Sequence, residues 1–157
     1  MAKKKIDEIL TLCAAKYPEH SFVVDPLNMD VIITPIEVVP EIFKWLRDDP
    51  ELRFDYFDFS TCTDHPPVTM DLIYYVFSNE HKHRLGLKVR LARENPIIGT
   101  VANLWRNADW NEREIYDLFG VFFTGHPDQR RLMMPDDWEG HPLRKDYMHP
   151  NVVTRPD

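Results

Sequence analysis

The sequence predicts an α+β fold, in which helices pack on one side of a mixed, mostly antiparallel sheet of about four strands and an extended, turn-rich C-terminal tail follows. Three observations support this fold class. Apolar residues recur at helical spacing in residues 3–16 and 38–48, residues 85–92 alternate between apolar and polar or small side chains, and residues 120–150 hold three of the five glycines and four prolines. These patterns indicate amphipathic helices, a half-buried strand and irregular structure, respectively.

The N-terminal part of the chain should contain two helices with a strand between them. In the first helix, at residues 3–16, Ile6, Ile9, Leu10 and Cys13 fall on one side, and Pro18 ends it. The apolar run at residues 31–33 predicts a short strand. The second helix covers residues 38–48, where Pro40 suits the first turn.

Three further strands are expected before residue 95. They cover residues 53–61, 70–77 and 85–92, and the polar residues 78–83 form a hairpin loop between the last two. Strands this close in sequence pair most simply in antiparallel fashion.

Two short helices should follow the strands. Thr100 can cap the first and Asp109 the second, where Glu112 stands at capping-box spacing. Gly120 is placed for the left-handed residue that ends many helices. We therefore expect a core domain at residues 1–120 and a separate docking tail at residues 121–157.

The tail combines turn residues with apolar side chains, which disordered linkers lack. Its apolar residues are Phe122, Phe123, Leu132, Met133, Met134, Trp138, Leu143 and Tyr147. About 30 ordered residues without regular structure are uncommon inside one domain. We therefore expect the tail to find its partners on another protein, with its arginines pairing with that protein's carboxylates.

Composition excludes several classes of function. The formal net charge of −7 leaves no basic stripe for nucleic acid beyond the run at residues 3–5. The chain has no stretch near the roughly 20 apolar residues that span a bilayer and no secretory signal, so we expect membrane association only through a partner. Cys13 and Cys62 are too few for an iron–sulfur cluster, which takes about four cysteines, and we expect both to be buried in a protein of a reducing compartment.

Residues 112–147 carry a series of fixed residue types. Residues 112–121 read EREIYDLFGV, residues 125–128 GHPD, residues 130–135 RRLMMP and residues 140–147 GHPLRKDY. This series resembles the signature of the 30-kDa subunit of respiratory complex I, which is designated C in the bacterial NADH:quinone oxidoreductase and J in the chloroplast-type complex. One departure is Gln129, where the family leads us to expect leucine.

The resemblance implies a cofactor-free subunit of the hydrophilic arm of a proton-pumping NADH:quinone oxidoreductase. Such subunits lie against the 49-kDa subunit that helps form the quinone pocket and near the subunit with the terminal iron–sulfur cluster, while FMN and the clusters belong to partner subunits. In bacteria the chain would be peripheral, at the cytoplasmic face of the plasma membrane. The expected interface residues are Glu112, Arg113, Glu114, Tyr116, Asp117, His126, Pro127, Arg130, Arg131, Met134, Pro135, Trp138, His141, Pro142, Arg144, Lys145 and Tyr147.

Histidines and acids leave other interpretations open. His81 and His83 could seed a metal site, although a solvated loop is favoured. His126 and His141 each precede a proline, which favours turn or contact roles over a ligand pair or a quinone-protonating role. The acids of residues 112–117 look like helix caps and ion pairs with Arg113 rather than acid–base catalysts.

Two alternative functions follow from these interpretations. The same structural role could belong to a membrane-bound hydrogenase or to a complex that oxidises the reduced deazaflavin F420H2, because related subunits occur there. A free-standing small metalloenzyme would instead use His126, His141 and nearby carboxylates.

Overall fold

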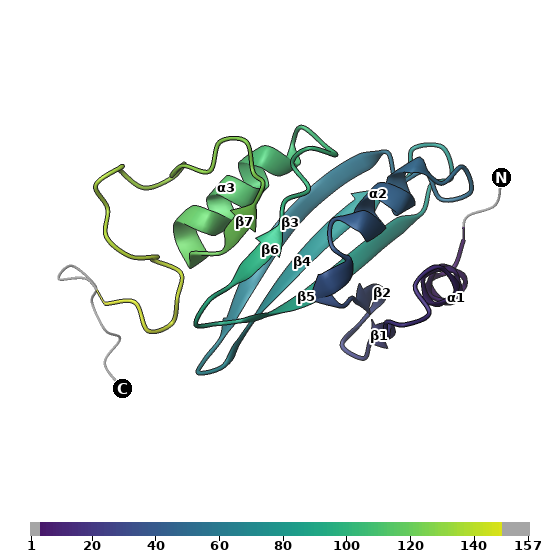
Figure 1. Ribbon diagram of the computed structural model, residues 1–157, viewed down its shortest axis with the longest axis horizontal. Helices are drawn as coiled ribbons and strands as arrows, with labels where there is room; N and C mark the ends of the chain where they lie inside the picture. The colour runs from purple at the N-terminus through teal and green to yellow at the C-terminus, as the bar shows by residue number, and fades with distance from the viewer. Residues whose placement is uncertain (1–3, 149–157) are drawn as a thin grey trace.

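The structure is a computed structural model that describes residues 4–148 (Figure 1). Its elements in chain order are α1 (Ile6–Lys16), β1 (Val23–Asp25), β2 (Asn28–Ile33), the single 3-10 turn η1 (Ile36–Val38), α2 (Glu41–Asp48), β3 (Tyr56–His65), β4 (Thr69–Phe77), β5 (Arg84–Ala92), β6 (Ile97–Gly99), α3 (Ala108–Phe119) and β7 (Phe122–Thr124). Within these residues no helix is long and apolar enough to cross a bilayer.

The main sheet has five strands in the order β1-β2-β5-β4-β3. β2 runs parallel to β5, and the other neighbours are antiparallel. The predicted α+β class with a mixed, mostly antiparallel sheet is therefore confirmed, with one strand more than expected. The added strand is β1, whose three residues pair with β2 and are too short to show an alternating pattern.

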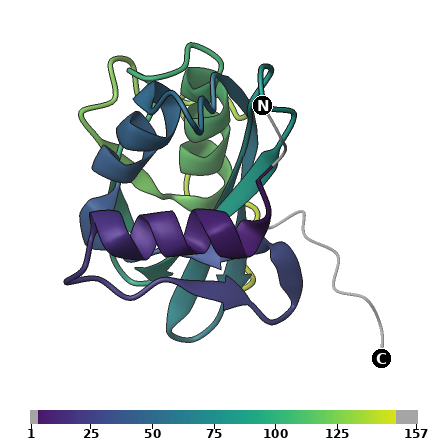
Figure 2. The same ribbon diagram turned by 90° about the vertical axis from the view of Figure 1, so that its right-hand side faces the viewer.

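The core lies on one face of this sheet. Leu85, Leu87, Val89 and Leu91 of β5 are all buried, whereas Arg90 between them is exposed. Ile9 and Cys13 of α1, Ile42, Phe43 and Leu46 of α2, and Ile115 of α3 belong to the same cluster of buried apolar side chains. Figure 2, in which α1 lies nearest the viewer, shows α2 and α3 beyond it.

A second, two-stranded sheet positions the C-terminal part of the chain. β6 and β7 pair in parallel, with Ile98 opposite Phe123, and both side chains are buried. α3 lies between these strands in sequence, and its Asn107 and Asn111 side chains bind the backbone of β3 at Phe57 and Ser60. α3 is thereby fixed along the edge of the main sheet, which also blunts an edge strand.

Three local expectations are wrong. Residues 101–107 form turns instead of a helix capped by Thr100, whose oxygen accepts the N–H of Ala102. α3 starts at Ala108, so Glu112 lies within the helix and does not close a capping box. The 78–83 loop is not solvated at its histidines: His81 and His83 are buried, and their Nε2 atoms lie 3.0 and 2.6 Å from the carbonyl oxygens of Pro50 and Leu52.

Candidate functional site

A buried carboxylate on α3 holds the chain that follows β7. Asp117 is fully buried, and its Oδ2 accepts the backbone N–H groups of Leu132, Met133 and Met134 at 3.0, 2.7 and 2.8 Å. Its Oδ1 accepts a hydrogen bond from Nη1 of Arg131 at 2.6 Å. Burial alone would raise the pKa of Asp117, but these donors outweigh burial and lower the pKa below its usual value.

The carbonyl groups at the end of α3 are also bound by residues 125–148, which we call segment 125–148. Helix ends leave such carbonyls without partners inside the helix. Here the donors are Nδ1 of His141 to Asp117 at 3.0 Å, the N–H of Leu143 to Leu118 at 3.0 Å, and Nε of Arg144 to Phe119 at 2.7 Å. Gly120 makes this packing possible, because its φ is +76° and a Cβ there would lie 2.5 Å from the His141 ring.

A second buried carboxylate, Asp64 on β3, holds the far end of segment 125–148. Asp64 receives two hydrogen bonds from Arg93, at 2.6 and 3.0 Å, and one from the N–H of Lys145 at 2.8 Å. The Arg93 guanidinium, which lowers the pKa of Asp64, also binds Asp146 at 3.0 Å. Asp64 therefore lies within β3 and anchors the segment.

These contacts correct the premise that the tail cannot satisfy its polar groups within its own chain. Arg131 and Arg144, expected to pair with a partner's carboxylates, bind Asp117 and the end of α3. The apolar side chains behave differently. Trp110, Phe122, Met133, Leu143 and Met148 are each 50–75% exposed.

The exposed apolar side chains come from neighbouring elements. α3, β7 and segment 125–148 lie side by side at one end of the molecule, at the left of Figure 1. A hollow of about 400 Å³ opens there, and its lining includes His141, Arg144, Tyr147 and Met148. The segment thus turns polar groups toward its own domain and several apolar groups toward solvent.

The residues expected at a partner interface fall into three groups. Glu112, Arg113 and Asp117 are buried; Tyr116, His126, Arg131, Met134, Trp138, His141, Pro142, Arg144 and Tyr147 are half-buried; Glu114, Pro127, Arg130, Pro135 and Lys145 are exposed. Sequence reasoning did not single out Trp110 or Met148, and it named Phe122, Met133 and Leu143 as apolar residues of the tail without including them among the expected interface residues. Helical spacing could have found Trp110, which shares the exposed side of α3 with Glu114 four residues later.

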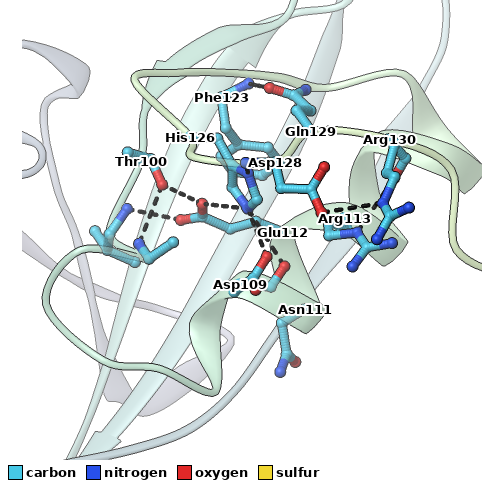
Figure 3. Close-up of polar contacts among 12 residues, drawn as sticks. Thr100, Asp109, Asn111, Glu112, Arg113, Phe123, His126, Asp128, Gln129 and Arg130 are labelled. Atoms are coloured by element: carbon cyan, nitrogen blue, oxygen red, sulfur yellow. Dashed lines mark hydrogen bonds and ion pairs between the residues drawn. The ribbon is translucent and has the colours of Figure 1, made fainter.

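The buried residues Glu112 and Arg113 of α3 form hydrogen bonds with two different segments next to the helix (Figure 3). Oε1 of Glu112 accepts the N–H of Val101 at 2.7 Å and Oε2 accepts the Thr100 hydroxyl, so Glu112 fixes the loop after β6. Arg113 donates to the carbonyl oxygens of Arg130 and Arg131, both at 3.3 Å, and lies over the ring of Trp110.

The glutamine that departs from the family pattern has a structural role of its own. The Gln129 side chain accepts the N–H of Phe123 at 3.1 Å and donates to the carbonyl of Val121 at 3.3 Å. It thereby ties the turn after β7 back to that strand, a contact that a leucine could not make.

The described residues offer no evident place for a metal ion. Between residues 4 and 148, no group of three or more His, Cys, Asp or Glu side chains is arranged to hold one. Cys13 and Cys62 are buried free thiols, as expected, and burial raises the pKa of each to about 12. Neither thiol is therefore a ready thiolate ligand.

Comparison with known proteins gives consistent results. The family model described as "Respiratory-chain NADH dehydrogenase, 30 Kd subunit" matches residues 32–152. The chain is 41% identical over 124 residues to the C subunit of the NADH-quinone oxidoreductase of Chloroherpeton thalassium, covering 78% of this chain and 52% of that one. It is 40% identical over 121 residues to the corresponding C subunit of Roseiflexus castenholzii, covering 76% and 69%. The chain thus spans about half the length of the first relative and more of the second.

Two solved structures share the fold. A trypsin-resistant fragment of Nqo5 superposes with a TM-score of 0.64 at 24% identity, covering 80% of this chain and 99% of the fragment. A chain of the membrane-bound sulfane sulfur reductase, an archaeal respiratory membrane complex, superposes with a TM-score of 0.72 at 21% identity, covering 96% and 94%. At these identities the likeness concerns the fold alone.

Proposed function

Because the chain belongs to the family of respiratory-chain NADH dehydrogenase 30 kDa subunits, we propose that it is a cofactor-free subunit of the C type that binds and braces redox subunits of an NADH:quinone oxidoreductase. Its neighbours would be the 49-kDa-type subunit of the quinone pocket and the subunit with the terminal iron–sulfur cluster. FMN and the clusters would belong to those partners. The chain would reach the cytoplasmic face of the membrane only as part of the complex.

The observation that supports this proposal is that segment 125–148 binds its own domain through polar groups and exposes apolar side chains to solvent. Its backbone is held by Asp117 and Asp64 and its Arg131 by Asp117, whereas Met133 and Leu143 are 63% and 51% exposed. A surface whose backbone is fixed before binding loses less conformational entropy when a partner docks. Exposed apolar side chains rimmed by polar groups are typical of protein–protein interfaces.

The expected interface residues divide into two roles under this proposal. Glu114, Arg130 and Lys145 are exposed and available to a partner directly. Glu112 and Asp117 are fully buried, so they would act by holding the surface in shape. For the domain division, expected at residues 1–120 and 121–157, we propose that the core extends to Thr124, since β7 pairs with β6, and that segment 125–148 would dock.

Assembly of the complex tests the proposal. In cells with a tagged chain, the double variant Met133→Asp with Leu143→Asp should reduce the assembled complex about tenfold or more, since each interface anchor contributes about 1–4 kcal/mol. Native gel electrophoresis of solubilised membranes and NADH:quinone reductase activity provide the readouts. Because both side chains are exposed, the urea midpoint of the purified variant should match that of the unmodified chain.

A matched control uses Leu27→Asp, which places the same charge at the turn between β1 and β2, where Leu27 is 90% exposed. This variant should leave assembly unchanged. Normal complex levels in the double variant would contradict the proposed docking surface.

The fold itself is compatible with a second assembly class. A chain of the membrane-bound sulfane sulfur reductase, an archaeal respiratory membrane complex, shares the fold over 96% of this chain. A hydrogenase or an F420H2-oxidising complex could use such a subunit equally well. Mass spectrometry of the subunits that co-purify with the chain decides: a flavin-containing NADH-oxidising subunit supports our proposal, and a nickel–iron subunit supports the alternative.

The third interpretation, a small metalloenzyme built on His126 and His141, has no support from the geometry. His126 lies against Asp109 and Glu112, whereas the His141 ring faces Gly120 and Tyr116. Elemental analysis of the purified chain tests this interpretation, and stoichiometric zinc or iron would restore it.

A further inference from the structure

Three titratable side chains meet inside the protein where α3 faces the turn after β7 (Figure 3). The side chains of Glu112 and His126 are both fully buried, so that the exposure of half-buried His126 comes from its backbone, whereas the Asp109 side chain is 30% exposed. Nε2 of His126 lies 3.2 Å from Oδ1 of Asp109 and 3.8 Å from Oε2 of Glu112. One imidazole nitrogen therefore faces two carboxyl groups.

The turn determines which imidazole nitrogen carries hydrogen. Nδ1 of His126 lies 3.1 Å from the backbone nitrogen of Asp128, which can only donate, so Nδ1 accepts that hydrogen bond. The hydrogen of the neutral ring is therefore on Nε2, which donates to the backbone carbonyl oxygen of Asp109 at 3.4 Å and lies near both carboxyl groups. A second ring proton would have to sit on Nδ1 and would break the hydrogen bond from Asp128.

The surroundings give Glu112 no cation. In the part of the chain described, its ion-pair geometry involves His126 and no lysine or arginine. Arg113, the next residue on α3, points instead to the carbonyls of Arg130 and Arg131. The titratable group that faces Glu112 from β4 is Tyr74, a neutral phenol whose pKa burial and then Glu112 raise well above its usual value.

We propose that Glu112, Asp109 and His126 form a proton-binding site, in which Glu112 is a neutral carboxylic acid in mildly acidic solution and its deprotonation loosens the turn at residues 125–128. A fully buried Glu112 carboxylate beside the Asp109 carboxylate, with one N–H and no cation, is unfavourable, because burial favours the neutral form of an acid. Consistent with this geometry, burial raises the pKa of Glu112 to about 7, although the hydrogen bonds from Thr100 and Val101 act in the opposite direction.

The hydrogen bonds fit the neutral acid. A proton on Oε2 of Glu112 would reverse the hydrogen bond from the Thr100 hydroxyl, whose oxygen also accepts the N–H of Ala102 at 3.0 Å, while Oε1 would still accept the N–H of Val101. Deprotonation releases the proton to solvent and leaves two carboxylates near the Nε2–H of His126. Proton uptake at Nδ1 would relieve the repulsion and would break the hydrogen bond from Asp128.

The site lies at the root of segment 125–148. His126 and Asp128 form the turn with which that segment begins, and Arg130 follows, bound to Asp128 at 3.0 Å. The proton on Glu112 therefore helps to hold the first turn of the surface that we propose for docking. The site itself does not depend on that function, because its geometry is complete within this chain.

NMR titration of the full chain tests where the proton resides. With glutamate carboxyl groups labelled with ¹³C and histidine with ¹⁵N, spectra are recorded from about pH 5 to 9, a range that brackets the expected midpoint. The signal that Glu112→Gln removes is assigned to Glu112. We expect it to titrate near pH 7, and the ¹⁵N signals of His126 report whether the hydrogen bond from Asp128 to Nδ1 changes in the same pH range. A Glu112 ionised down to pH 5 would overturn the proposal.

Two variants separate a proton site from a merely structural glutamate. Asp109→Asn removes the neighbouring negative charge, so it should lower the Glu112 midpoint. Glu114→Gln is the matched control, since Glu114 is exposed on the same helix, and it should leave that midpoint unchanged. An Asp109→Asn midpoint equal to that of the unmodified chain would contradict the cluster.

Hydrogen exchange tests the loosening of the turn. At pH 8, the Asp128 amide should exchange about tenfold more slowly in Glu112→Gln, which mimics the neutral acid, than in the unmodified chain. His141, whose pKa burial lowers, is present in both proteins, so its titration cancels in the comparison. Equal exchange rates would refute the loosening. If the variant does not fold, the titration of the unmodified chain and Asp109→Asn still decide the proton site.

Discussion

Replacing Asp117 by asparagine tests how segment 125–148 is held. Asp117 accepts three backbone N–H groups and the Arg131 guanidinium and is fully buried. Hydrogen bonds to a charged group contribute about 1.5–3 kcal/mol each, but they are not additive, and asparagine keeps one accepting oxygen. Breaking a buried charge pair by removing one partner costs about 3–5 kcal/mol, which we take as the expected loss.

The molecule can limit this loss by releasing the segment locally. If the side-chain NH₂ group of the asparagine in the Asp117→Asn variant takes the place of Oδ2, it meets the backbone N–H groups of residues 132–134, which are also donors. Detachment of residues 131–134 relieves this conflict without unfolding the sheet. We therefore expect hydrogen exchange at Leu132, Met133 and Met134 to accelerate roughly a hundredfold, since about 1.4 kcal/mol corresponds to a factor of ten. Exchange in β4 and β5 should change far less.

The control for Asp117→Asn is Asp136→Asn, the same chemical change at an exposed residue of the segment. It should leave exchange at residues 132–134 unchanged. Retained protection of these amides in Asp117→Asn would refute the anchoring role. The contribution has a defined pH dependence: because the folded pKa of Asp117 is lowered, its stabilisation is present above the usual value of 3.8 and is lost as the pH falls below it.

Three further predictions concern other contacts. Gly120→Ala should lower thermal stability, by about 1–2 kcal/mol for the left-handed conformation alone and further because the new Cβ meets the His141 ring; an unchanged melting temperature would contradict this. Asp64→Asn should free the end of the segment, so that trypsin cleaves after Lys145 faster than in the unmodified chain, and equal rates would count against the anchor. Glu112 has a folded pKa near 7 against 4.5 unfolded, so stability should fall by about 3 kcal/mol as the pH rises from 5 to 8, and Glu112→Gln should abolish this slope in urea unfolding.

The strands in which apolar and polar residues clearly alternate could be predicted, but the end of one strand could not be placed correctly. β4 and β5 lie within a residue or two of the predicted ranges. β3 was predicted at residues 53–61 but runs from Tyr56 to His65. Phe54 extended the apolar pattern of the strand too far toward the N-terminus, whereas Arg53 before it has a φ of +42°, outside the range of extended backbone.

Short elements depend on contacts that no local pattern records. β6 and β7 have three residues each and form because they pair with each other, 25 residues apart in register from Ile97 to Phe122. Glu112 shows the same limit for a site residue. Its spacing from Asp109 satisfied a capping rule, but the loop at Thr100 uses its carboxylate instead.

For the tail, the irregular backbone could be predicted from the sequence, but the groups that bind it could not. Glycine and proline density predicted irregular structure, and none of the residues described after Thr124 lies in a helix or strand. The group that accepts hydrogen bonds from the backbone N–H groups of the tail could not be predicted. Asp117 lies 15 to 17 residues before Leu132 and Met134, and in the sequence it resembles any other acidic residue of a helix. Arginines were expected to face a partner because charge on an irregular segment usually faces outward; here the buried carboxylates are within reach.

Different side chains anchor segment 125–148 and form its exposed apolar surface, so substitutions at the two kinds of position should have different effects. If anchoring and docking used the same side chains, every substitution in segment 125–148 would disturb both the isolated chain and its assembly. The structure instead assigns anchoring to Asp117 and Asp64 and leaves Met133 and Leu143 exposed. Anchor variants should therefore change hydrogen exchange in the isolated chain as well as assembly, whereas surface variants should change assembly alone. Anchor and surface variants with the same profile would show that the segment is shaped by its partner and not before it.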